Sequence, residues 1–332
     1  MNDIDIISKL KKVVGKPFNY KIEFETDQCT ELDLTSPNDN FQGLIRHHSV
    51  SEKEEIIQLI SQLKNLRYLN LRRNQLKSIS DALGGLYKLN FLDIASNDLG
   101  VVPNWIKEIH DLRYLNVGVN QLTEVPVFLA KFVNMEQLLI HKNQIKVYHD
   151  EYAVFSKMKM INFYFNQIPE IPEIVFNYEN LSTLTWGISK INAISPSIGK
   201  LKRLQYFSFV ANDMEYLPDS FCDLESLVAT RLHKNKLKEL PANIGKLHKL
   251  EQITVYQNNL TGLPASFGEL DSLQKLNLSW NEFETFPTEV NKLRSLKWFA
   301  YFYNKPTAIP ELKGVQVVLD REVALDQLMK TD

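Results

Sequence analysis

The chain has 332 residues, of which 44% are hydrophobic and 23% charged, with a formal net charge of −2 and a pI near 6.4. This composition is typical of a folded protein and excludes global disorder, while the near-neutral charge gives no field that would gather phosphate backbones, so we expect no nucleic-acid partner. No stretch of the sequence approaches the roughly 20 apolar residues of a membrane-spanning helix.

The first segment expected to fold is an amphipathic helix in residues 1–15. Its sequence, MNDIDIISKLKKVVG, has lysines that interrupt any apolar run, so it lacks the hydrophobic region of a signal peptide. The two cysteines, Cys29 and Cys222, lie far apart and cannot supply the disulfide clusters of small extracellular caps. A reducing, cytoplasmic location is the simplest expectation, with leaderless secretion or a trimmed leader as open alternatives.

Residues 1–65 are predicted to form an N-terminal cap. A degenerate first repeat begins at Cys29, and residues 36–50 are an insertion. Ser51 to Glu54 read S-E-K-E, the pattern of a capping box, and the apolar residues behind it predict a second helix. A stacked array needs such a cap, because its terminal repeat would otherwise present an apolar face to water.

Eleven copies of the pattern L-x-x-L-x-L-x-x-N follow at a constant step of 23 residues without an insertion. Their first positions are Leu66, Leu89, Leu112, Met135, Met158, Leu181, Leu204, Leu227, Leu250, Leu273 and Leu296. Composition alone does not produce such a series. The L-x-L core predicts a short strand in which positions four and six of each repeat point inward while positions three, five and seven point outward.

The ninth position carries an asparagine whose side-chain amide can satisfy backbone groups of the turn after the strand. This row consists of Asn74, Asn97, Asn120, Asn143, Asn166, Asn212, Asn235, Asn258, Asn281 and Asn304, with one break at Ser189. The second half of each repeat, such as LPANIGKL in residues 240–247, places a proline at a bend and two inward apolar residues on a short helical or 3₁₀ turn. Thr230 departs from the pattern, because an inward aliphatic residue is expected there.

The end of the chain is predicted to form a C-terminal cap in residues 313–332. The sequence VQVVL in residues 315–319 predicts a last strand, and residues 321–329 a short helix.

These repeats resemble those of the leucine-rich-repeat family, in the 23-residue L-P-x-x-I-G-x-L-x-x-L class of bacterial repeat proteins and of intracellular Ras-group proteins of eukaryotes. The resemblance covers residues 66–312, the predicted array of eleven repeats. It implies an α/β solenoid, a curved horseshoe with a parallel sheet on the concave face, short helical or 3₁₀ turns on the convex face, and a cap at each end. It also implies protein recognition, although a fold does not determine its ligand.

Outward strand positions of a repeat protein are expected to be polar unless a partner docks there, yet many here are apolar or aromatic. We predict that the concave face binds a protein or peptide through an apolar centre with a basic rim, because strand alternation turns these side chains outward. The predicted residues are Tyr164, Phe165, Ile188, Tyr206, Val210 and Tyr256, with His141, Lys142, Arg231, His233 and Lys234 as the rim. The alternative is that the rings pack against each other for stability. For Trp298, Phe302 and Tyr303, cover by the C-terminal cap is the favoured interpretation.

No catalytic motif, cofactor motif or metal-ligand spacing occurs in the sequence. His47 and His48 are adjacent but lack the further ligands of a zinc site, so a solvated loop is expected, and no activating base is placed near Cys222. We therefore expect a monomeric, non-enzymatic interaction module that needs no cofactor. The alternatives are the targeting part of a regulator or secreted bacterial effector whose activity lies elsewhere, and a self-associating scaffold.

Overall fold

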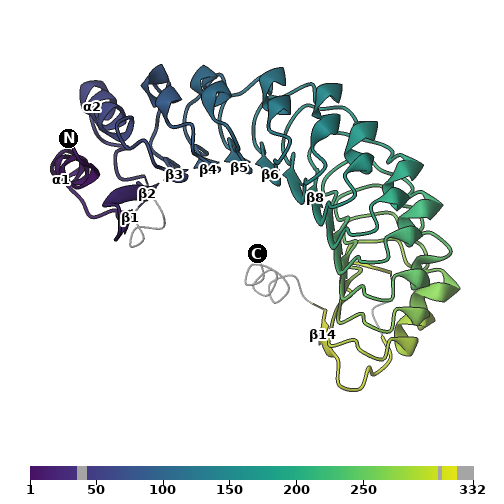
Figure 1. Cartoon of the computed structure of the whole chain (residues 1–332). Helices are drawn as coiled ribbons and strands as arrows, with labels where there is room; N and C mark the ends of the chain where they lie inside the picture. Colours follow the sequence, from purple (N-terminus) through teal and green to yellow (C-terminus); the bar gives the residue numbers. More distant parts are fainter. Residues whose placement is uncertain (36–42, 306–308, 320–332) are drawn as a thin grey trace. The chain divides into compact units, whose positions relative to one another are not determined.

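The structure, a computed structural model, describes residues 1–35, 43–305 and 309–319. The chain divides into two compact units, residues 1–167 and residues 168–332. In each unit the strands lie on one side and the 3₁₀ helices on the other (Figure 1). Within the described residues, no helix has both the length and the apolar character needed to span a membrane.

The first unit begins with two α-helices and a hairpin and continues as repeats of one strand and one 3₁₀ helix. Its α-helices are α1 Asp3–Val14 and α2 Val50–Ile60. Its strands are β1 Asn19–Glu23, β2 Gln28–Asp33, β3 Tyr68–Asn70, β4 Phe91–Asp93, β5 Tyr114–Asn116, β6 Gln137–Leu139 and β7 Met160–Asn162. Its 3₁₀ helices are η1 Asp81–Gly85, η2 Asn104–Glu108, η3 Val127–Lys131 and η4 Asp150–Val154.

The second unit continues the same alternation. Its strands are β8 Thr183–Thr185, β9 Tyr206–Ser208, β10 Ala229–Arg231, β11 Gln252–Thr254, β12 Lys275–Asn277, β13 Trp298–Ala300 and β14 Gln316–Val318. Its 3₁₀ helices are η5 Glu173–Asn177, η6 Pro196–Lys200, η7 Asp219–Asp223, η8 Ile244–Lys246, η9 Ala265–Glu269 and η10 Thr288–Lys292.

Within each unit the repeat strands pair in parallel, and equivalent positions of neighbouring repeats lie side by side. Leu69 pairs with Leu92 in the first unit and Thr230 with Ile253 in the second. The degenerate repeat joins this register, because Leu32 of β2 pairs with Leu69 of β3. The predicted last strand is confirmed as β14, which pairs in parallel with β13. The antiparallel partner of β2, strand β1, was not predicted from the sequence.

The asparagine ladder links each turn to its neighbour. Asn97 is a typical rung: its Oδ1 accepts the backbone N–H groups of Asn74 and Leu76, both at 3.0 Å. Its Nδ2 donates to the carbonyl groups of Leu71 at 3.1 Å and Ile94 at 2.9 Å. The amide therefore satisfies backbone groups of two repeats, as the sequence predicts.

The ladder is less complete beside its break at Ser189. Asn212 Oδ1 accepts the N–H groups of Ser189 at 3.1 Å and Ile191 at 3.3 Å, but its buried Nδ2 has no hydrogen-bond partner among the described residues. Thr230, the other departure from the pattern, is fully buried in β10, and its Oγ1 also finds no partner within the described part of the chain. The fold thus accommodates Ser189 and Thr230, but the buried Asn212 Nδ2 beside Ser189 and the buried Thr230 Oγ1 lack hydrogen-bond partners among the described residues.

The N-terminal segment is helical as predicted, with one correction. Helix α1 has Asn2 as its N-cap and ends at Gly15, whose φ is 68°. The capping box of α2 is formed by Ser49 and Glu52, not by Ser51 and Glu54: Ser49 N–H donates to Glu52 Oε2 at 2.7 Å, and Glu52 N–H donates to Ser49 Oγ at 3.3 Å. The helix predicted for residues 321–329 lies outside the described residues.

Candidate functional site

The outward side chains at positions three, five, seven and eight of each repeat form what we call the strand face. In five repeats the Asn or Asp at position five accepts the backbone N–H of position seven through Oδ1, which fixes the backbone after those strands. These bonds measure 3.0 Å for Asn70–Arg72, 2.9 Å for Asp93–Ala95, 3.0 Å for Asn116–Gly118, 3.1 Å for Asn162–Tyr164 and 3.0 Å for Asn277–Ser279. From the sequence, position five was expected to point outward, but its side chains were assigned no role.

Position eight has a left-handed backbone in all eleven repeats, with φ between 51° and 60°. Its members are Arg73, Ser96, Val119, Lys142, Phe165, Ile188, Ala211, Lys234, Gln257, Trp280 and Tyr303. Strand alternation therefore does not place Ile188 or Phe165 outward, contrary to the sequence argument. The turn does so, because the left-handed residue changes the direction of the chain after the strand.

In the first unit, the predicted binding residues Tyr164 and Phe165 lie two and three residues after the end of β7 at Asn162. Their ring centroids are 6.4 Å apart and tilted by 49°, and Phe165 is 49% exposed. Lys142 lies in the neighbouring repeat, where its N–H donates to the Tyr164 carbonyl at 2.7 Å, and its side chain is exposed. The structure thus brings these three residues together on the strand face of this unit.

His141 does not extend the basic rim at neutral pH. Burial, Arg72 and Lys142 lower the pKa of His141 to about 4, so its imidazole is neutral. Its ring lies against Gly118 of the preceding repeat, and a Cβ at Gly118 would clash with the ring. Glycine at this position therefore lets the histidine lie close to the sheet.

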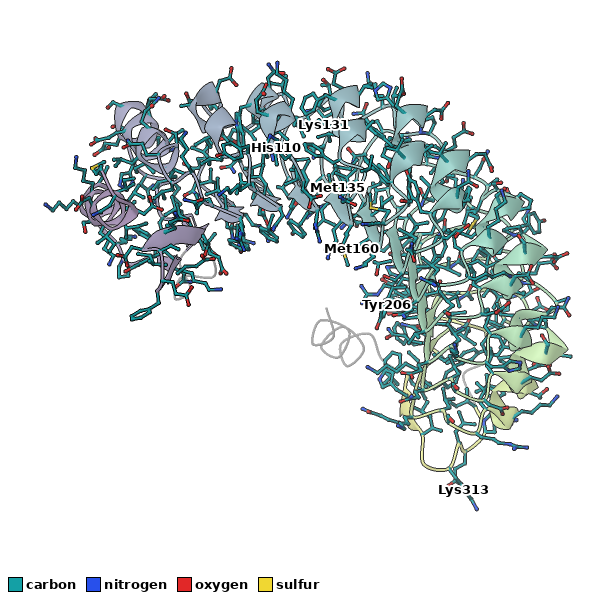
Figure 2. The ribbon with its side chains drawn as sticks, in the orientation of Figure 1. His110, Lys131, Met135, Met160, Tyr206 and Lys313 are labelled. Atoms are coloured by element: carbon teal, nitrogen blue, oxygen red, sulfur yellow. The ribbon has the colours of Figure 1, made fainter. Side chains whose placement is uncertain are left out.

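In the second unit, the predicted apolar residues differ in exposure. Ile188 is 38% and Tyr206 49% exposed, whereas Val210 is 8% exposed and contributes little to the surface. Val210 stands at position seven of its repeat, and its carbonyl accepts the N–H of Ile188 at 3.0 Å. Figure 2 shows Tyr206 on the strand side of its unit, and Met160 on the strand side of the first unit.

Tyr256 and the three predicted cations of the second unit come from consecutive repeats. The rings of His233 and Tyr256 stack with centroids 4.2 Å apart and planes 11° apart. The N–H of Lys234 donates to the Tyr256 carbonyl at 3.0 Å. His233 and Arg231 are partly buried, whereas the Lys234 side chain is exposed. The rim of this unit is therefore supported by ring stacking, in partial agreement with the alternative that the rings pack for stability.

Two further ring groups on the strand face were not assigned to the predicted site. In the first unit Tyr68, Phe91 and Tyr114 form a stack with centroid distances of 4.1 Å and 4.0 Å. In the second unit Trp280 stacks on Tyr303 at 5.0 Å. The recurrence of aromatic residues at position three could have identified the first group from the sequence.

The acidic neighbour of the first stack, Asp93, is buried. Burial raises the pKa of Asp93, although its carboxylate accepts from the Ala95 N–H at 2.9 Å and from Asn116 Nδ2 at 2.9 Å. Burial and Asp93 raise the pKa of Tyr114 to about 12. The stack thus consists of neutral rings beside a hydrogen-bonded carboxyl group.

The described residues offer little for nucleophilic or metal chemistry. Burial and Asp3 raise the pKa of Cys29 to about 12, and burial and Asp219 raise that of Cys222 to about 11, so both thiols are protonated at neutral pH. Within the described ranges, no three histidine, cysteine, aspartate or glutamate side chains are grouped to hold a metal ion.

The comparisons with known proteins agree with this repeat pattern. The family model described as leucine rich repeat matches residues 58–99 and 230–283. A leucine-rich-repeat protein of Leptospira interrogans is 26% identical, with a TM-score of 0.66 over 79% of this chain and 74% of that chain. An internalin of Listeria monocytogenes is 18% identical, with a TM-score of 0.70 over 95% of this chain and 94% of that chain.

A third similar structure is a plant receptor. It is the plant peptide hormone receptor RGFR1 in complex with RGF2, which is 23% identical with a TM-score of 0.58. The match covers 79% of this chain and 52% of the receptor chain. No curated protein matches the chain in sequence. These likenesses concern the repeat fold.

Proposed function

We propose that this leucine-rich-repeat protein is a non-enzymatic module that binds a protein or peptide partner through its strand face. The observation that carries the proposal is the exposure of large apolar side chains there, 49% for Phe165, 38% for Ile188 and 49% for Tyr206. The stacked core is formed by their inward neighbours at positions four and six, which are buried. Covering them with a partner would remove apolar surface from water.

The comparisons support a recognition function without naming a partner. The receptor RGFR1 is described as a peptide hormone receptor in complex with RGF2, which shows that a protein with this repeat fold presents a surface to another molecule. The raised pKa values of Cys29 and Cys222 also oppose a role for either thiol as a nucleophile.

The proposal is tested with the double variant Tyr164→Ser/Phe165→Ser. We expect it to lose the proteins that the parent captures from an extract of its source organism and to keep a thermal midpoint close to that of the parent, because partly exposed side chains contribute little to the core. Serine tolerates the backbone of position eight, where Ser96 has a φ of 53°. The matched control is Val133→Ser/Val147→Ser, two residues that are 52% and 53% exposed outside the strands of the same unit.

Three outcomes contradict the proposal in different ways. An unfolded double variant would show that the rings are structural. A folded variant that retains every partner would place binding elsewhere on the molecule. A parent that sediments as an oligomer, and a double variant that sediments as a monomer, would show that the strand face pairs with a second copy of the chain.

A further inference from the structure

The strand face of the second unit carries cations but no carboxylates. From β8 to β13, positions three, five, seven and eight include Arg231, His233, Lys234 and Lys275, and none of these positions holds aspartate or glutamate. The chain as a whole has a formal net charge of −2, so this face differs in sign from the average surface. The carboxylates of these repeats lie in the turns and around the 3₁₀ helices, for example Asp213, Glu215, Asp219, Asp223, Glu225, Glu239, Glu269, Asp271, Glu282, Glu284 and Glu289.

The first unit shows that the fold does not require this separation. Its strand face holds Glu31 and Asp33 in β2 and Asp93 in β4 at equivalent positions. Lys21 neutralises Glu31 in an ion pair of 3.1 Å. Carboxylates are therefore compatible with these strand positions, and their absence from the second unit gives that unit a distinct electrostatic character.

Two of the cations are available to a ligand. Lys234, after β10, and Lys275, in β12, both have exposed side chains, and neither forms an ion pair within the described residues. Glu251 borders the face one residue before β11. Lys234 and Lys275 belong to repeats two strands apart, which corresponds to roughly 10 Å across the sheet at about 4.8 Å per strand.

Aromatic rings lie among these cations. Tyr206 is 49% exposed in β9, and Tyr256 stacks on His233. A tyrosine offers a large apolar surface and a hydroxyl group with few rotatable bonds, so little conformational entropy is lost when it contacts a ligand. The surface therefore suits a ligand with negative charges spaced along an extended chain and apolar groups between them.

We propose that the strand face from β9 to β12 binds an acidic peptide segment, with aspartate or glutamate side chains at Lys234 and Lys275 and apolar side chains against Tyr206 and Tyr256. The inference rests on the proposed function and adds the chemistry of the partner. A nucleic-acid strand fits less well, because Arg231, Lys234 and Lys275 are the only lysine or arginine residues at positions three, five, seven and eight of the four repeats from β9 to β12, and they would neutralise few phosphates.

The test uses the full chain and a rhodamine-labelled peptide of about twelve residues that alternates glutamate and tyrosine, with binding followed by fluorescence anisotropy. We expect Lys234→Glu/Lys275→Glu to raise the dissociation constant at least about 10-fold, because two attractions become repulsions. The matched control is Lys246→Glu/Lys249→Glu, which makes the same change in net charge at exposed residues within and after η8. It is expected to change the constant less than about 2-fold, because exposed charges farther than a Debye length are screened.

Several results would overturn the inference. Equal weakening by the two variants would show that only net charge matters. A lysine–tyrosine peptide that binds as tightly would exclude charge recognition, and tighter binding of a labelled oligothymidylate would favour a nucleic acid. If charge reversal unfolds the protein in a thermal melt, Lys234→Gln/Lys275→Gln replaces it and should weaken binding by about 3-fold or more.

The inference and the proposed function can fail separately. If Tyr164→Ser/Phe165→Ser loses the captured partners while the parent does not bind the acidic peptide, the strand face binds proteins but the partner is not acidic. In the opposite case, the parent binds the acidic peptide, Lys234→Glu/Lys275→Glu does not, and Tyr164→Ser/Phe165→Ser keeps every captured partner. This result would show that the second unit alone carries binding.

Discussion

Thr230 and Asn235 lie five residues apart in one repeat of the second unit, and both are buried polar residues. Asn235 Nδ2 donates to the carbonyl groups of Phe209 at 2.8 Å and Leu232 at 2.9 Å, and its Oδ1 accepts the N–H of Met214 at 3.3 Å. Thr230 Oγ1 finds no partner among the described residues. The turn that contains Asn235 thus supplies matched donors and acceptors, whereas the strand neighbours of Thr230, Phe207 and Ile253, are apolar.

The largest expected effect comes from removing a complete rung of the ladder. Asn235→Leu should lower the free energy of unfolding by about 1–3 kcal/mol, because the backbone groups that its amide satisfies stay buried without partners. Denaturant unfolding followed by circular dichroism measures the loss. An unchanged midpoint would mean that the ladder does not contribute to stability.

The same substitution beside the break should cost less. Asn212→Leu removes the bonds that Oδ1 accepts from Ser189 and Ile191, but Nδ2 makes none in the described structure. We expect a loss of about 1 kcal/mol, and in any case a smaller one than for Asn235→Leu in the same titration. Equal losses for the two variants would show that the donor half of the amide is unimportant.

Replacing the unmatched hydroxyl should stabilise the protein. Thr230→Val keeps the shape of the side chain, removes a buried oxygen without a partner, and should raise the free energy of unfolding by up to about 1 kcal/mol. Thr254→Val is the control, because Thr254 is also buried but its Oγ1 lies 3.3 Å from His233 Nδ1. A gain for both variants would reflect β-propensity instead of the relief of an unpaired hydroxyl.

A pH dependence is also expected in the first unit. The folded pKa of His141, about 4, is below the ordinary value of 6.5, so the folded state binds this proton less readily than the unfolded chain. The contribution to stability is complete above pH 6.5 and is lost as the pH falls from 6.5 towards 4. His141→Gln should flatten the fall in thermal midpoint between pH 7 and pH 4.5, and parallel curves for parent and variant would contradict the assignment.

The periodic part of the fold could be predicted from the sequence because one constant step assigns a role to each position. The inward rows and the asparagine ladder recur eleven times or nearly so, and a pattern repeated so often outweighs local ambiguity. The two ends of the chain do not repeat this pattern, so fewer sequence positions constrain their structure. Both Ser49 and Ser51 precede a glutamate by three residues, so the sequence offers two equivalent capping boxes, and the structure uses the first.

The candidate site could be predicted only in part, because alternation applies to the strand and ends with it. Tyr206 lies within β9 and faces outward as alternation requires. Ile188 and Phe165 come after their strands and have a left-handed backbone conformation, and the side chain of Val210 is buried. Exposure at these positions depends on contacts between repeats, which the sequence does not list. The binding role of all the predicted residues stays a prediction.

The left-handed residue after each strand has a consequence for how this surface can change. Arginine, serine, valine, lysine, phenylalanine, isoleucine, alanine, glutamine, tryptophan and tyrosine all adopt it with nearly the same φ, although glycine would adopt it with less strain. The scaffold therefore accepts almost any chemistry at this point of the repeat, and β-branched Val119 and Ile188 do so against their intrinsic preference. A side chain at position eight therefore costs some stability and provides a group that can contact a ligand. An array with glycine at these positions should be more stable but should lack these contacts.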